Sequence, residues 1–265
     1  MIQFNLNRFA NLAKWSLAMD RRWLVKAMLS WMVVFSLTFL FFTCVAVVHK
    51  DYESMEISYT PCALMSVFSA IAVFVLGGSF MFQNFKTKHD DQRYLMLPAS
   101  NLEKFLMRYS IWLLSLPCFL LAFVVGDVVQ WVVNTLLAHK GTMLVMQYLA
   151  NATYEVNWNS DIPRALGVSI ALTFVWLHSV YVVGATFFRS HKFNWVLTSI
   201  VLIAGGIFGG TLWPNDYFAL HIDEHTAIYL LYLWNGIYVL LIALNFWLSY
   251  RFFCRQQVIG KFVNV

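Results

Sequence analysis

The chain has 265 residues, of which 60% are hydrophobic, 18% are aromatic and only 12% are charged. A soluble globule of this size needs more polar side chains to cover its surface, so the composition excludes a soluble domain and indicates an integral membrane protein. The net charge of +5 reflects cations placed beside the membrane. A nucleic-acid-binding function is excluded because no folded basic domain is evident.

Six apolar segments are long enough to cross roughly 30 Å of hydrocarbon as helices. We therefore expect an all-α membrane protein whose transmembrane domain covers residues 27–253. The third segment is long enough to be tilted, to be interrupted at Pro117, or to end beyond the bilayer. The six segments are Ala27 to Val48, Pro61 to Phe85, Phe105 to Ala138, Ile162 to Phe188, Phe193 to Leu212 and Thr226 to Phe253.

The distribution of charge predicts the orientation of the spans. All of the 18 basic residues except Lys50, Lys140 and Arg164 fall on the side of the N-terminus. Basic residues near span ends are retained in the cytoplasm, so both termini, the connection 86–104 and the tail 254–265 are expected inside. The opposite side carries most of the acidic residues, namely Asp51, Glu53, Glu56, Glu155, Asp161, Asp216, Asp223 and Glu224.

Residues 1–26 precede the first span and carry apolar side chains at helical spacing. The pattern predicts an amphipathic helix on the inner face of the membrane. Such a helix could simply anchor the first span, or it could contact a cytoplasmic partner. The apolar positions are Leu6, Phe9, Ala10, Ala13 and Leu17.

The connection between the second and third spans combines charge with an apolar turn. Lys88, Asp90, Asp91 and Arg93 precede the apolar residues Leu95, Met96 and Leu97. Pro98 then ends any helix, because proline lacks an amide donor and disfavours α geometry in the residue before it. A short helix is therefore expected before Pro98. It is either an ordinary solvated loop element or a surface that docks into a groove of another protein.

The start of the third span has a capping-box pattern. Ser100 and Glu103 have the spacing S-x-x-E directly before an apolar run. The Ser100 hydroxyl can accept from the Glu103 amide, while the Glu103 carboxylate accepts from the Ser100 amide. The third helix is therefore expected to begin here.

The segment LMLPASNLEKF, from Leu95 to Phe105, resembles the signature region of ABC-2-type transporter permeases. The form L-P-A-S followed by E-K-F is especially similar to permease-like proteins of Bacteroidetes. The resemblance implies that Lys88 to Leu97 is a coupling helix that seats in a separate ATPase subunit. It further implies that Pro98 to Ser100 is a hinge and that Glu103 with Lys104 forms the foot of the third span.

The same resemblance implies the partners and the location. Two permease subunits, identical or paralogous, would assemble with two ATPase subunits in the inner membrane of a bacterium and export a substrate. ATP and magnesium would bind to the ATPase, and this chain would hold no cofactor. One departure is the outer connection Trp213 to His225, which is short for the re-entrant helices that family members often place there.

Missing motifs agree with this division of labour. No G-x-x-x-x-G-K-[ST] loop occurs, so the chain lacks the phosphate-binding loop of an ATPase. H-E-x-x-H, G-x-S-x-G and Cys/His clusters are also missing, so no catalytic residues or metal ligands are assigned.

Three polar residues inside the spans are candidates for other roles. Asp127 and Gln130 in the third span could share one helical face. Asp127 could act in a proton relay of an ion-coupled transporter, or it could lie in water near the outer end of a long helix. His178 in the fourth span is expected to hydrogen-bond a neighbouring helix rather than bind haem. A membrane subunit without transport activity, which anchors or regulates a complex, is a further alternative.

The fifth span contains two interlaced G-x-x-x-G pairs. Small residues at this spacing allow two helices to approach closely, either within the subunit or across a dimer interface. The four glycines are Gly205, Gly206, Gly209 and Gly210.

Overall fold

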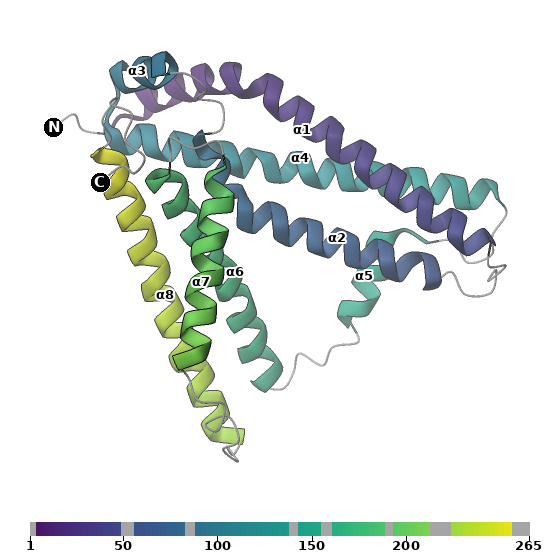
Figure 1. Ribbon diagram of the computed structural model, residues 1–265. Coiled ribbons are helices and arrows are strands. Elements are labelled where there is room, and N and C mark those ends of the chain that lie inside the picture. The colour runs from purple at the N-terminus through teal and green to yellow at the C-terminus, as the bar shows by residue number, and fades with distance from the viewer. Residues whose placement is uncertain are drawn as a thin grey trace. The chain divides into compact units, whose positions relative to one another are not determined.

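The computed structural model describes residues 4–48, 56–82, 88–137, 143–154, 161–188, 193–212 and 224–255, which form helices and contain no strand. The expected all-helical fold is therefore confirmed for these ranges. Figure 1 shows the helices in chain order. They are α1 (Leu6–Val48), α2 (Glu56–Gly77), the 3-10 helix η1 (Gly78–Phe82), α3 (Lys88–Met96), α4 (Asn101–Leu136), α5 (Val145–Tyr154), α6 (Asp161–Phe187), α7 (Asn194–Leu212) and α8 (Glu224–Cys254).

Within the described ranges, five helices are long and apolar enough to cross a membrane, as a multi-pass membrane protein requires. They lie within α1, α2 with η1, α4, α6 and α8. The fifth predicted span coincides with α7, whose segment Asn194–Phe208 is a shorter apolar helix.

Two helices continue through positions where the sequence suggested a boundary. The amphipathic helix predicted for residues 1–26 and the first predicted span belong to one helix, α1, of 43 residues. At 1.5 Å per residue α1 is about 65 Å long, so much of it must lie beyond the hydrocarbon layer. The interruption considered at Pro117 is also absent, since α4 passes through it for 36 residues.

The helices form two compact units. Unit 1 contains Met1–Ala13, Phe74–Tyr109 and Trp158–Val265, and unit 2 contains Lys14–Val73 and Ser110–Asn157. The unit boundaries cut α1, α2 and α4, so each of these helices contributes to both units.

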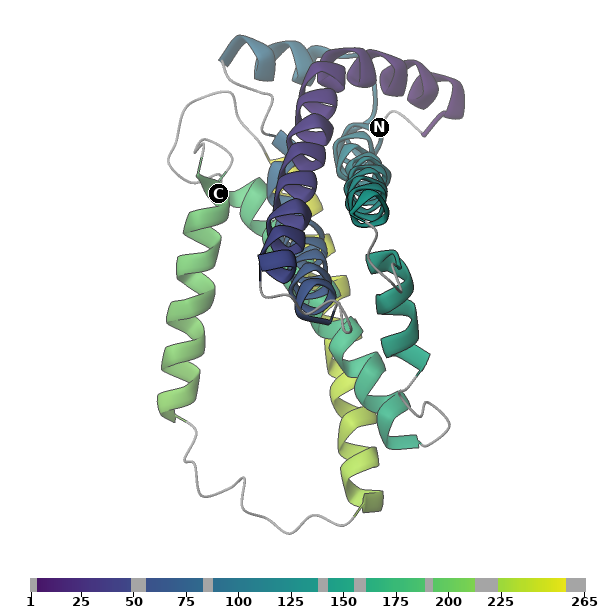
Figure 2. The ribbon, with the colours of Figure 1, turned by 90° about the vertical axis from the view of Figure 1, so that its right-hand side faces the viewer.

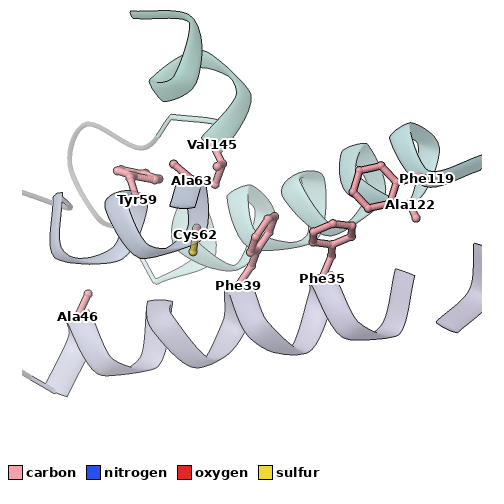
Figure 3. Packing of buried hydrophobic residues seen from close by; sticks show 9 residues of the cluster. All are labelled: Phe35, Phe39, Ala46, Tyr59, Cys62, Ala63, Phe119, Ala122 and Val145. Carbon is pink, nitrogen blue, oxygen red and sulfur yellow. The ribbon is translucent and has the colours of Figure 1, made fainter. Parts of the chain in front are cut away.

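Unit 2 has an aromatic core between α1 and α4 (Figure 3). The ring centroids of Phe35 and Phe119 are 5.3 Å apart, and those of Phe39 and Phe123 are 6.1 Å apart. Both pairs advance by one helical turn, so α1 and α4 run side by side in the same direction. The buried cluster also takes in parts of α2 and α5. Its members are Phe35, Phe39, Ala46, Tyr59, Cys62, Ala63, Phe119, Ala122 and Val145.

Unit 1 is built on the packing of α6 against α8, which lies alongside it in Figure 2. Polar side chains connect the two apolar helices. The Ser169 hydroxyl donates to Oδ1 of the Asn235 side chain at 2.8 Å. Nδ2 of the Asn245 side chain donates to the Ser179 hydroxyl at 2.9 Å. Such bonds between helices hold a membrane bundle together where lipid supplies no hydrophobic driving force.

Gly126 sets how closely α1 and α4 approach. A Cβ atom added at Gly126 would lie 2.7 Å from the Cβ of Phe35, whereas one added at Gly205 would meet nothing within 4 Å among the described residues. Gly126→Ala should therefore lower the free energy of unfolding by about 1–3 kcal/mol through overpacking. Gly205→Ala is the matched control and should leave stability unchanged or raise it by up to about 1 kcal/mol. Thermal unfolding of the detergent-solubilised variants measures both, and equal effects would contradict the packing.

Candidate functional site

The candidate site is the junction between α3 and α4, where the capping box is confirmed. The Ser100 amide donates to Oε2 of Glu103 at 2.8 Å, and the Glu103 amide donates to the Ser100 hydroxyl at 3.2 Å. Helix α4 accordingly begins at Asn101, four residues before the predicted span. The predicted short helix before Pro98 is also present, as α3.

The Glu103 carboxylate is buried and joins this junction to the start of α1. Its Oε1 accepts from the backbone amide of Asn5 at 2.7 Å and from Nη2 of Arg8 at 2.6 Å. Its Oε2 accepts from Nε of Arg8 at 2.8 Å, in addition to the Ser100 amide. A bidentate guanidinium–carboxylate pair is the strongest form of ion pair, so this contact fixes the beginning of α1 against α4.

The last turn of α3 is bonded to the first two turns of α4. The buried Tyr94 hydroxyl donates to the Lys104 carbonyl, and Nζ of Lys104 donates back to the Leu95 carbonyl at 2.7 Å. The Arg108 guanidinium lies 5.0 Å from the centre of the Tyr94 ring, within cation–π range. These reciprocal contacts make α3 and the start of α4 one rigid piece.

Aromatic contacts connect the same piece to α8. The ring of Phe253 lies 6.4 Å from Tyr94, 5.7 Å from Phe105 and 6.1 Å from Phe82. Phe253 is buried, so the C-terminal end of α8 packs against α3 and the start of α4. The predicted coupling segment therefore contacts α4 and α8 within unit 1, and α8 in turn contacts η1.

The three apolar residues predicted at the end of α3 differ in how far they are exposed. Met96 is 83% exposed, whereas Leu95 and Leu97 are only partly exposed. Arg93 is exposed beside it, as are Pro98 and the α4 residues Asn101 and Leu102. Met96 is therefore the apolar side chain that a partner would meet first.

Other members of the predicted coupling set have different positions. Lys104 is buried and bonded within the chain, so it supports α3 instead of facing a partner. Lys88, Asp90 and Asp91 belong to α3, and their side chains lie outside the described residues.

Asp127 has a structural partner that the sequence did not indicate. Its carboxylate accepts hydrogen bonds from the amides of Val145 at 2.7 Å and Met146 at 3.0 Å, the first two residues of α5. Free amides and the helix dipole at a helix start favour a carboxylate there. Asp127 is only 2% exposed, so the expectation that it lies in water is wrong.

Three buried polar side chains of unit 2 lack a hydrogen-bond partner in the part of the chain that the structure describes. The side-chain atoms of Thr43, Gln130 and Asn134 are fully buried and have no hydrogen-bond partner among the described residues. A buried polar group without a partner costs about 1–3 kcal/mol. Five such atoms would cost as much as the whole stability of a typical domain, about 5–15 kcal/mol.

His178 is bonded between helices, as expected. Its Nδ1 donates to the Phe74 carbonyl at 2.8 Å, so its Nε2 can accept from the Tyr109 hydroxyl at 3.3 Å. The described residues contain no group of three or more His, Cys, Asp or Glu side chains that could hold a metal ion.

Two of the four glycines of α7 make no close contact with the described part of the chain. Gly205 and Gly206 are exposed, and an added Cβ at either would meet no described atom within 4 Å. Gly209 and Gly210 also belong to α7, but their surroundings lie outside the described residues. Close packing within the described part of the subunit is therefore not observed at Gly205 and Gly206.

Removing the Glu103 carboxylate should release the start of α1. Glu103→Ala leaves the amides of Asn5 and Ser100 without an acceptor, which should lower the free energy of unfolding by about 1–3 kcal/mol. Hydrogen exchange of residues 4–13 should become faster, with a smaller effect in Arg8→Ala because the two amides keep their acceptor. Arg22→Ala, at an exposed position of α1, is the control. Unchanged exchange in Glu103→Ala would contradict the role of the carboxylate.

No protein-family model, curated protein or solved structure matches the chain. Function therefore has to be inferred from the residues and geometry of the chain itself. The α3–α4 junction is the candidate site because its helix start is capped, hydrogen bonds hold α3 to α4, and Met96 is exposed.

Proposed function

We propose that the chain is the membrane-spanning permease subunit of an ABC-2-type transporter, driven by a separate ATPase. The observation that carries the proposal is the α3–α4 junction, a short helix with an exposed apolar tip that is bonded to the start of a membrane helix. This geometry agrees with the role that the LMLPASNLEKF segment implies. In the proposal α7 is the sixth element that crosses the membrane, and both termini are cytoplasmic.

A docking surface must be accessible, and Met96 satisfies this requirement. Its side chain projects beyond Leu95 and Leu97, and the cationic side chain of Arg93 is exposed on the same helix. An apolar side chain beside a charge suits a groove with an apolar floor and an acidic rim. We assign the contact with the ATPase to Met96 and Arg93.

Force transmission requires that α3 moves together with the membrane helices. The bonds of Tyr94 and Lys104 join α3 to α4, and the Phe253 contacts join it to α8. Closure of the ATPase on α3 would therefore shift the start of α4 and the end of α8 as one body. In this proposal ATP and magnesium stay in the partner, two permease copies face each other in a bacterial inner membrane, and the direction is export.

The ion-coupled alternative relied on Asp127 as a proton carrier. The two amides of α5 already occupy its oxygens. A carboxylate that holds a helix start serves the fold in its ionised form, and protonation would weaken both hydrogen bonds. We therefore assign Asp127 to the attachment of α5 and do not propose ion coupling.

Met96→Asp tests the proposed contact. The tagged chain, purified from membranes of its native host, should bring with it an ATP-binding-cassette protein with vanadate-sensitive ATPase activity. Met96→Asp should reduce the recovered activity at least tenfold, because it places a charge in an apolar contact. Met96→Leu, which preserves volume and polarity, is the matched control and should keep the activity.

Size-exclusion chromatography separates loss of binding from loss of folding, since Met96 is exposed and its substitution should not alter the profile. Recovery of the same ATPase activity with Met96→Asp would remove α3 as the docking element. Failure of the wild-type chain to recover any ATPase would contradict the proposed function as a whole.

A further inference from the structure

One face of α4 changes character along unit 2. Phe119 and Ala122 belong to the apolar core near the middle of the helix (Figure 3). Asp127, Gln130 and Asn134 follow at spacings of three and four residues, which places them on one face of the helix. All three are buried, so this polar stretch faces the interior of the unit.

Thr43 of α1 lies at the same level. A Cβ added at Gly126 would lie 2.7 Å from that of Phe35. The two helices run in the same direction, so Thr43, eight residues beyond Phe35, is level with Asn134, eight residues beyond Gly126. The Thr43 side chain is fully buried, so its hydroxyl lies in the interior of unit 2 at the level of the polar stretch of α4.

The hydrogen-bonding capacity of this cluster exceeds what the described residues supply. Each carboxamide offers two N–H donors and an oxygen acceptor, and the threonine adds a hydroxyl. None of these atoms in Thr43, Gln130 and Asn134 has a partner among the described residues. The nearby Asp127 carboxylate is bonded to two amides of α5, so the unfilled capacity belongs to neutral groups.

We propose that Thr43, Gln130 and Asn134 form a water-binding site in the interior of unit 2. Water matches the site because each molecule can donate and accept, as the mixed donors and acceptors of two carboxamides and a hydroxyl require. The site would make a hydrated region at the C-terminal ends of α1 and α4, a property that does not depend on the ATPase.

Other partners fit the cluster less well. Lipid chains have no hydrogen-bonding groups, and side chains with no exposed surface cannot be reached by another protein. Gln130 and Asn134 are one turn apart and could bond to each other after a change of rotamer. That bond would use one donor and one acceptor and leave the remaining capacity unfilled.

Thiol labelling tests for water at the site. Gln130→Cys and Asn134→Cys, each in a chain without native cysteines, are reconstituted in lipid nanodiscs and treated with a small water-soluble methanethiosulfonate. A thiol reacts as its thiolate, which forms only where water or polar groups stabilise the charge. The matched control is Ala122→Cys, equally buried on the same face of α4 but in the apolar core. The native cysteines to be replaced by alanine are Cys44, Cys62, Cys118 and Cys254.

We expect Gln130→Cys and Asn134→Cys to react at least tenfold faster than Ala122→Cys. Rates equal to that of the control would overturn the proposal. Thr43→Cys, the smallest change in volume, provides the same comparison if the carboxamide variants do not fold.

Asn134→Leu gives a second, independent readout. If water satisfies the carboxamide, leucine removes those hydrogen bonds and the midpoint of thermal unfolding falls. If no water is bound, leucine replaces a buried carboxamide that has no hydrogen-bond partner, and the midpoint of thermal unfolding stays or rises. That result would contradict the proposed water-binding site.

Discussion

The Glu103 carboxylate holds the start of α1 against the start of α4. It accepts hydrogen bonds from the Asn5 amide, the Arg8 side chain and the Ser100 amide, while its own side chain is buried. A buried charge is tolerated only when its hydrogen-bonding capacity is filled, so these groups must keep their geometry together. The next residue, Lys104, bonds to the last turn of α3 through Leu95 and Tyr94. Tyr94 is buried by these bonds, and Met96 remains exposed at the end of α3.

Buried polar side chains connect helices in both units. In unit 1 Ser169 and Ser179 bond to α8 and hold it against α6. In unit 2 the Asp127 carboxylate holds the start of α5, whereas Gln130 and Asn134 have no partner among the described residues. These two carboxamides give unit 2 a polar interior suited to water.

Local signals in the sequence predicted the elements of the site, but they could not predict the long-range contacts between those elements. Pro98 and the Ser100–Glu103 box act within a few residues, so the end of α3 and the start of α4 were predictable. Arg8 and Glu103 are separated by 95 positions, and no local pattern links them. The exposure of Met96 over Leu95 and Leu97 depends on where Tyr94 and Lys104 anchor the last turn of α3, which hydropathy does not encode.

We propose that the chain works with an ATPase and that α3 touches this partner. A photoreactive benzophenone amino acid in place of Met96 tests it directly, with the same probe in place of the exposed Met146 of α5 as the control. Irradiation of native membranes should cross-link the first variant, and not the second, to a protein with a nucleotide-binding loop identified by mass spectrometry. Adducts with lipid alone at Met96, or the same protein adduct from both positions, would contradict the account.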